Sequence, residues 1–252
     1  MKRWSWGWQG RIHVARSAFR ETECVRRKGH ALAVHYILRI TLFYACLHRA
    51  LWVAVTPLII YFQVILSRAS TAAQTVLGEA FAGFITSDRC PAYNWVDVNR
   101  RQICWAHLKR DFIQISERIG ASAEIGQVLL DQEKELFNLW HQYRNDQLTR
   151  SELQQVVEPI QAKILSQLRE AAALDIGADE KTPLAKTVRT CRNLLKLEAA
   201  LWLFIAEDGV EPTNNAAERA IRPAVIWRMQ SRRGFLGVRF TKQLIITKRH
   251  KL

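Results

Sequence analysis

Residues 211–228 read EPTNNAAERAIRPAVIWR, and the interpretation of the whole chain starts from this stretch. A Pro-Thr-Asn-Asn turn precedes one acidic residue, two arginines and an apolar run that contains a tryptophan. Asn215 is predicted to be the N-cap of a short helix, and Glu218, three residues later, completes a capping-box spacing. Arg219 and Arg222 then take neighbouring positions on one helix face. The spacing leaves two roles open for Glu218, as a helix cap or as a reactive carboxylate.

Two further stretches belong with it. Residues 87–95 read SDRCPAYNW, and residues 101–112 read RQICWAHLKRDF. In this order, the three stretches resemble the catalytic signature of the insertion-sequence-66 family of bacterial DNA transposases. The resemblance covers about residues 51–228 and stops on both sides. What it implies is an enzyme that cleaves and joins DNA strands.

The expected fold class is α/β. Residues 51–56 and 58–66 are predicted strands because they are apolar and rich in β-branched and aromatic side chains, with Pro57 between them. The resemblance implies a ribonuclease-H-like core interrupted by an all-helical insertion, and we expect this core to lack its first strand. The chain then divides into a divergent basic segment (1–50), the strand-rich part of the core (51–115), the helical insertion (116–207), the returning catalytic helix (208–228) and a divergent basic tail (229–252).

The chemistry rests on two carboxylates. Asp88 follows a predicted strand over residues 84–87, and it matches the second acid of the family's Asp-Asp-Glu triad, while Glu218 matches the third. If they meet at one sheet edge, they suit Mg2+ (or Mn2+), which prefers oxygen ligands. Two such ions can activate a water or a 3′-hydroxyl for in-line attack on a phosphodiester. From sequence alone, Asp88 could equally be a helix N-cap at a strand end.

The first acid of the triad is absent. Where the family has an aspartate, residues 35–50 read HYILRITLFYACLHRA and contain no carboxylate. Glu21 and Glu23 are the only acids before Glu79, and neither lies in a strand-like context. Since losing a ligand weakens metal binding and misplaces the nucleophile, we expect that this chain alone cannot transpose DNA.

The resemblance also marks residues around the carboxylates. Cys104, His107, Asn214 and Asn215 belong to the family signature, and His107 could orient a metal-bound water or touch phosphate. Cys104-x-x-His107 is half of a zinc spacing, but no second pair follows it, so a structural zinc is not indicated. Plausible phosphate contacts, each with an equally simple interpretation as surface charge, are Lys109, Arg110, Arg219, Arg222 and Arg228.

The net charge of +14 lies almost wholly at the two ends of the chain. Residues 1–50 and 228–252 each carry a charge of +8, whereas residues 51–227 carry −2. Basic segments are typical of nucleic-acid binding. The same composition fits ends that are translated out of the ancestral reading frame. The resemblance makes DNA the expected partner, and no small-molecule substrate is expected.

Three functions therefore remain open. The leading one is an insertion-element transposase catalytic region that is inactive because it is truncated or frame-shifted; its family implies a homo-oligomer and accessory proteins of the same element. A second is a non-catalytic DNA-binding remnant. A third is a small membrane-anchored protein, because residues 50–66 carry no charge and nearly reach spanning length. Five unevenly spaced cysteines and no clean signal peptide favour the cytoplasm.

Overall fold

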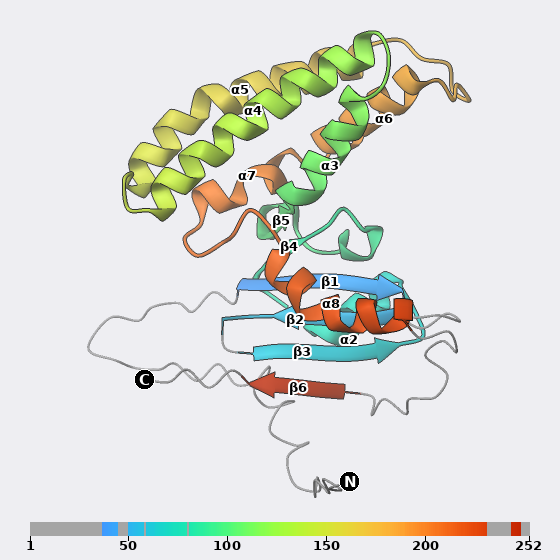
Figure 1. Ribbon diagram of the computed structural model, residues 1–252, viewed down its shortest axis with the longest axis vertical. Coiled ribbons are helices and arrows are strands. Elements are labelled where there is room, and N and C mark those ends of the chain that lie inside the picture. The colour runs from blue at the N-terminus through green and yellow to red at the C-terminus, as the bar shows by residue number, and fades with distance from the viewer. Residues whose placement is uncertain (1–36, 45–49, 58, 80, 231–242, 248–252) are drawn as a thin grey trace, which may run out of the picture.

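The computed structural model describes residues 37–44, 50–57, 59–79, 81–230 and 243–247. The chain builds a mixed α/β unit around one sheet, with a helical bundle stacked against one end of that sheet (Figure 1). The polypeptide leaves the sheet after its fifth strand, passes through the bundle, and returns to the sheet as helix α8. Residues predicted to act together therefore come from segments that lie on either side of the bundle in sequence.

Six strands form the sheet in the order β5-β4-β1-β2-β3-β6. Strand β2 pairs antiparallel with both β1 and β3, and β6 pairs antiparallel with β3. Strands β4 and β5 run parallel to β1. The strands are β1 (Ile37–Tyr44), β2 (Ala50–Val55), β3 (Ile59–Ile65), β4 (Phe84–Ser87), β5 (Arg101–Ile103) and β6 (Gln243–Thr247).

The prediction that the core lacks its first strand is wrong. Strand β1 lies between β4 and β2, with Arg39 opposite both Thr86 and Val55. Its sequence, ILRITLFY, is apolar enough to occupy a central position, but it contains no aspartate or glutamate. The expectation rested on the missing carboxylate of the family signature, whereas the strand is defined by its pairing with β2 and β4. The first strand of the sheet is therefore present, but it does not carry the expected carboxylate.

The two faces of β2 alternate, as expected for a strand buried on both sides. Leu51, Val53 and Val55 share a core cluster with Ala217 and Ile221 of α8 (Asn215–Gln230). On the other face, residues of even number pack against α2 (Ser70–Leu77) and the short helix η1 (Pro91–Tyr93): Ala50, Trp52 and Ala54. This packing fixes α8, and with it Glu218, on one face of the sheet.

The apolar stretch at residues 50–66 forms β2 and β3, as predicted, with its break at Thr56 and Pro57. Among the residues that the structure describes, no helix is both long enough and apolar enough to cross a membrane. The stretch that suggested a membrane anchor is thus two strands of the sheet.

The bundle consists of five helices around a single apolar core. They are α3 (Trp105–Ser116), α4 (Ala121–Arg144), α5 (Arg150–Ala173), α6 (Pro183–Leu195) and α7 (Glu198–Ala206). Helix α4 crosses the end of α3 at Gly126, where a Cβ atom would lie 2.3 Å from the backbone nitrogen of Ser116. Only glycine permits this approach, which sets the angle at which the long helices leave the sheet.

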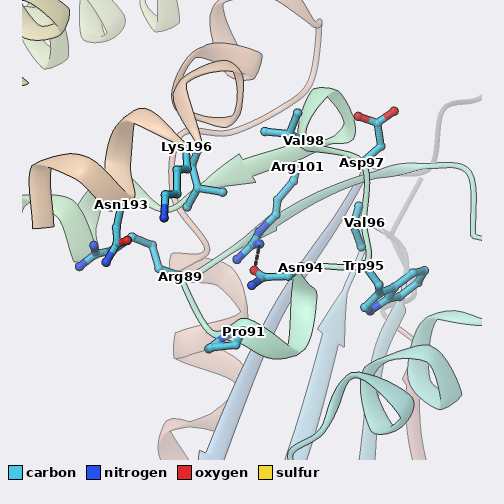
Figure 2. Close-up of a pocket in the computed structure, with 11 residues that line it drawn as sticks. Arg89, Pro91, Asn94, Trp95, Val96, Asp97, Val98, Arg101, Asn193 and Lys196 are labelled. Carbon is cyan, nitrogen blue, oxygen red and sulfur yellow. Dashed lines mark hydrogen bonds between the residues drawn. The ribbon is translucent and has the colours of Figure 1, made fainter. Parts of the chain in front are cut away.

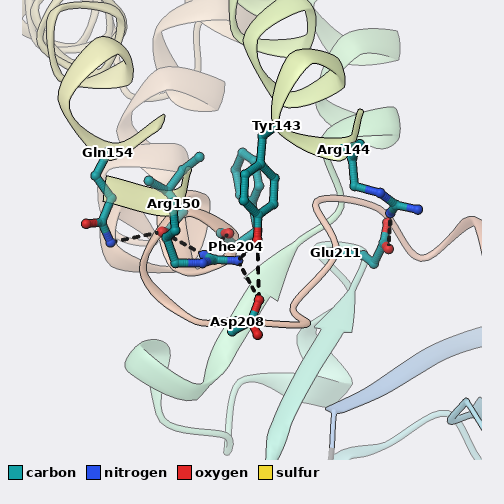
Figure 3. Close-up of polar contacts among 8 residues, drawn as sticks. Tyr143, Arg144, Arg150, Gln154, Phe204, Asp208 and Glu211 are labelled. Carbon is teal, nitrogen blue, oxygen red and sulfur yellow. Dashed lines mark hydrogen bonds and ion pairs between the residues drawn. The ribbon is translucent and has the colours of Figure 1, made fainter. Parts of the chain in front are cut away.

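A polar cluster ties the connection between α4 and α5 to the end of α7 and to the segment that leads into α8 (Figure 3). The guanidinium of Arg150 donates to the carbonyls of Phe204 and Ile205, at the end of α7, and to the carboxylate of Asp208. It also donates to the hydroxyl of Tyr143, over whose ring it lies. These contacts satisfy carbonyls left open at a helix terminus, and so anchor residues 206–208 before the chain returns to the sheet.

Candidate active site

The three signature segments meet at the carboxyl ends of β4 and β5. The backbone nitrogen of Cys104 donates to the carbonyl of Ser87 at 2.8 Å, and that of Trp105 donates to the carbonyl of Pro212 at 2.9 Å. The hydroxyl of Thr86 donates to the carbonyl of Glu211 at 3.2 Å. Residues separated by more than a hundred positions are therefore joined by hydrogen bonds at one sheet edge.

Asp88 is the first residue after β4 and is half-buried. One of its carboxylate oxygens accepts a hydrogen bond from the backbone nitrogen of Cys90 at 3.0 Å. The carboxylate thus stabilises the turn that enters η1, but Asp88 is not the N-cap of that helix, since the N-cap is Cys90. The bond occupies Oδ1 and fixes the direction of the side chain.

Arg101 lies beneath this loop and is almost fully buried, with an exposed fraction of 1%. Its guanidinium donates to the hydroxyl of Ser87, to the side-chain oxygen of Asn94, and to the carbonyl of Asp88 at 2.8 Å. Burial lowers the pKa of Arg101, and the nearby Asp88 carboxylate opposes that effect. A buried cation with its donors satisfied in this way holds the backbone of Asp88 in place.

His107, on the first turn of α3, lies beside Glu218 and within electrostatic range of Asp88. Its Nε2 is 3.7 Å from Oε1 of Glu218, and both side chains are partly exposed. Burial lowers the pKa of His107, as does the neighbouring Arg110, whereas Asp88 and Glu218 act in the opposite direction. The Nδ1 atom is buried and has no hydrogen-bond partner in the described part of the protein. Because the effect of burial is the largest, the pKa of His107 lies below its ordinary value, which favours the neutral imidazole.

Cys104 is used for packing and for a backbone contact. Its Sγ atom accepts a hydrogen bond from the backbone nitrogen of Asn214 at 3.4 Å, and the thiol is fully buried. Burial raises the pKa of the thiol, while the hydrogen bonds that it receives from backbone groups of Asn214 and His107 lower it. The sulfur therefore joins α3 to the segment before α8.

Helix α8 begins one residue earlier than predicted. Asn215 is its first residue rather than its N-cap, and the carbonyl of Asn214 accepts from the backbone nitrogens of Ala217 and Glu218. The predicted capping box between Asn215 and Glu218 is thus out of register by one position. Asn214 is fully buried and Asn215 is exposed, so the two asparagines of the signature have different surroundings.

Comparison with known proteins decides the family. The sequence profile of the transposase IS66 family matches residues 47–237, which is most of the chain. The chain belongs to the IS66 transposase family. It is also 30% identical over 129 residues to the uncharacterized protein y4qI of Sinorhizobium fredii (strain NBRC 101917 / NGR234). That alignment covers 51% of this chain and 23% of y4qI, so the chain matches about a quarter of that protein. No solved structure matches the chain.

In this IS66-family chain the carboxylate expected on the first strand has no counterpart in β1. Within the residues that the structure describes, no three His, Cys, Asp or Glu side chains are grouped as metal ligands would be. The structure therefore brings Asp88, His107 and Glu218 into one neighbourhood, in which Asp111 of α3 also lies near His107, and β1 supplies no acid to it.

The cations predicted to contact DNA have different environments. Lys109 forms an ion pair with Glu133 of α4 at 2.9 Å, and the carboxylate of that glutamate is almost fully buried. Arg110, Arg219 and Arg222 are exposed. Arg228 lies in α8, but its side chain is outside the described residues. Lys109 thus already compensates a buried charge, whereas the three exposed arginines are available to a polyanion.

Sequence reasoning missed two arginines in this IS66-family site. Arg101 was seen only as the start of a signature stretch, and Arg89, which forms an ion pair with Asp111, was not singled out. A buried arginine that opens a strand of three residues carries no periodic signal. Its four acceptors lie in residues 87–94, in the loop before the strand, and only the folded chain brings them around it.

Proposed function

We propose that this chain contains the catalytic region of a DNA transposase, built on a ribonuclease-H-like fold, whose ancestral chemistry is metal-dependent cleavage and joining of phosphodiesters. The observation that carries the proposal is the meeting of the three signature segments at the ends of β4 and β5. The strand order supports the fold assignment, because three antiparallel strands are followed by two that run parallel to the first. Helix α8 then delivers Glu218 to the same edge.

Asp88 and Glu218 are the residues that would hold a divalent ion. Mg2+ commonly takes one or two protein carboxylates and completes its coordination with water and substrate phosphate, so this donor set fits a single ion. When bound, such an ion makes a water or a 3′-hydroxyl a stronger nucleophile. The residues of the chain have their own roles: Arg101 fixes the backbone of Asp88, and His107 offers a neutral imidazole beside Glu218.

We also propose that the chain does not carry out strand transfer. Its β1 strand has no carboxylate, and two-metal catalysis needs ligands for both ions. The remaining function would be DNA binding through exposed arginines around the site and the basic ends of the chain, as in the remnant interpretation. DNA is the proposed partner, and a homo-oligomer with accessory proteins of the element is the proposed assembly.

The test is Mn2+ binding by the purified chain, followed by electron paramagnetic resonance. The expected stoichiometry is one ion, and Asp88→Asn or Glu218→Gln should each abolish binding. Asp131→Asn is the matched control, because this carboxylate of α4 is exposed and hydrogen-bonds only within its own helix to Gln127. Binding that is identical in all four proteins would contradict the metal assignment.

Restoring the lost acid sharpens this test. Position 41 lies two residues beyond Arg39 in β1, and Asp88 lies two residues beyond Thr86, the β4 partner of Arg39. Thr41 also pairs with Val53, which belongs to the sheet face that carries α8. Thr41→Asp should therefore tighten Mn2+ binding about tenfold or more, since an added carboxylate raises the ligand charge. Strand transfer by the unaltered chain, lost in Asp88→Asn, would overturn the proposed inactivity.

A further inference from the structure

A pocket of about 850 Å³ opens beside the loop that follows Asp88 (Figure 2). One wall is the loop between β4 and β5, and the other is the turn between α6 and α7. Its size lies within the range of small-molecule and cofactor sites, about 300–1,000 Å³. The pocket therefore lies between the sheet and the bundle, next to the candidate active site, and no role has been assigned to it.

The lining of this pocket is cationic. Arg89, Arg101 and Lys196 contribute three positive charges, and the one carboxylate in the lining, Asp97, accepts hydrogen bonds from Asn99. The donors of Arg101 are used by protein groups, and Arg89 is shared with Asp111, whereas Lys196 is exposed. Figure 2 shows the ends of Arg89 and Lys196 on the same side of the pocket as Asn193. An anion is the ligand favoured by this arrangement.

The remaining lining adds an aromatic surface. Trp95 and the apolar side chains near it form part of the wall, and Asn193 offers an amide that can donate to an oxygen. Trp95 is partly buried against the core cluster that includes α2, and it lines the same pocket as the cations. Cations next to an aromatic ring are the combination that binds single-stranded nucleic acid, with phosphates on the cations and a base on the ring. A simple inorganic anion would make no use of the tryptophan.

The pocket is also coupled to the carboxylate site by covalent structure and by hydrogen bonds. Arg89 directly follows Asp88 in sequence, and Arg101, in the pocket wall, donates to the carbonyl of Asp88 at 2.8 Å. A strand held in the pocket would thus lie against the loop that presents Asp88. Its phosphodiester backbone would continue toward that carboxylate over a short distance.

We propose that this pocket binds one nucleotide of a single DNA strand, with the phosphate on Lys196, Asn193 and Arg89 and the base against Trp95. The proposal rests on the proposed function, because it takes DNA as the substrate of the Asp88 site. It adds a subsite that positions the strand, contributed jointly by the loop between β4 and β5 and by the end of α6 with the turn that follows it. The helical bundle is then part of the substrate-binding surface as well as a spacer between the signature segments.

The test is binding of a fluorescein-labelled oligothymidine of about 15 nucleotides to the full chain. Fluorescence anisotropy measures it in the presence of EDTA, so that metal binding plays no part. Lys196→Ala should weaken binding about fivefold to tenfold and lower the slope of log K against log salt concentration by about 0.7, as one lost phosphate contact on a single strand predicts. Asn193→Ala should weaken binding about threefold without changing the slope, because it removes a neutral hydrogen bond.

The matched control is Lys186→Ala. Lys186 is an exposed lysine of the same helix, α6, and it does not line the pocket. Its loss should change the affinity less than twofold, since a charge remote from the bound strand is screened by salt. Circular dichroism on each variant confirms that the helices are retained.

Three outcomes would overturn the assignment of the pocket. Equal effects of Lys186→Ala and Lys196→Ala would mean that DNA binds to diffuse charge, and the proposed function would stand without the pocket. Binding of free thymidine monophosphate but not of the oligonucleotide would make the ligand a mononucleotide. Full displacement of the oligonucleotide by oligoglutamate at equal charge would make the site one for acidic peptides. Loss of Mn2+ binding in Asp88→Asn, with oligothymidine binding unchanged, reports on the metal site alone.

Discussion

The helical bundle and the edge of the sheet are stabilised in opposite ways. In the bundle, a continuous set of apolar side chains is buried, and aromatic rings of Trp105, Trp140 and Phe204 pack edge to face. At the edge formed by β4 and β5, the buried residues are largely polar: Thr86, Ser87, Arg101, Gln102 and Asn214. Burial of apolar area is tolerant of small shifts, whereas a buried hydrogen-bond network fixes positions. The bundle therefore contributes most of the stability, and the sheet edge formed by β4 and β5 fixes the geometry of the site.

The largest expected effect lies in the bundle core. Trp105 is fully buried, and its indole nitrogen donates to the carbonyl of Leu201 at 2.8 Å. Trp105→Ala should lower the free energy of unfolding by about 3–5 kcal/mol, through lost burial and the cavity that remains. Urea denaturation followed by circular dichroism measures it. Ile119→Ala, at an exposed residue, should cost less than about 0.5 kcal/mol. A difference below 1 kcal/mol between the two variants would contradict an apolar core as the main source of stability.

Arg101→Met tests the polar edge. Removing the guanidinium takes the charged donor away from the Ser87 hydroxyl, the Asn94 side-chain oxygen and the Asp88 carbonyl, which should cost about 2–4 kcal/mol although the Ser87 hydroxyl still donates to that carbonyl. The amide of Cys90, which donates to Asp88, should then exchange its hydrogen faster. Arg100→Met is the control, because Arg100 is exposed and makes one bond to the carbonyl of Ala82. Unchanged exchange at Cys90 would show that Arg101 does not position the Asp88 loop.

A pH dependence of intermediate size should come from Cys191, in the bundle. Burial raises the pKa of this thiol from 9.0 to about 11. Because the folded pKa is above the unfolded one, the folded state holds the proton more tightly, and stability is complete below pH 9 and falls between pH 9 and 11. Two pH units correspond to at most about 2.7 kcal/mol. Urea denaturation at pH 8.5 and 10.5 should show a smaller decline in Cys191→Ala than in the unaltered chain; equal declines would contradict this.

The smallest effect is expected where the bundle meets the connecting segment. Arg150→Met removes donors to two terminal carbonyls of α7 and should cost about 1–2 kcal/mol. Arg169→Met breaks an exposed ion pair with Glu198 and should cost under about 0.5 kcal/mol. Thermal denaturation of the two variants in parallel gives the comparison. If Arg169→Met proved the costlier of the two, the anchoring role of Arg150 would be refuted.

Local signals in the sequence mark the starts of two bundle helices. The capping box of Thr149 and Glu152 forms at the start of α5, and Thr182 caps α6 before Pro183. Each signal lies within four residues of the bond that it makes, so a single sequence suffices to detect it. The strands at residues 51–56 and 58–66 were predicted from composition for the same reason.

The features that were missed depend on distant partners. Strand β1 pairs with β4, more than forty residues later, as well as with the next strand β2, and its place beside β4 leaves no mark in the local sequence. Arg101 is explained only by the loop that surrounds it. The three signature segments themselves were recognised, but their contact could be inferred only through the family. The physical reason is that long-range hydrogen bonds leave no period in the sequence.

The bond from Asn214 to Cys104 spans 110 residues, and that from Thr86 to Glu211 spans 125. During synthesis all five bundle helices must emerge from the ribosome before residues 211–214 can reach β4 and β5. Because the entropy of closing a loop grows only with the logarithm of its length, and a folded bundle holds the loop ends close, this late step costs little. Until residues 211–214 reach the sheet, one face of β2 is not covered by α8, and Thr86 and Cys104 lack their hydrogen-bond partners Glu211 and Asn214. The site is then completed only after the bundle helices have been synthesised, and a nascent chain stalled before that point exposes sheet to aggregation.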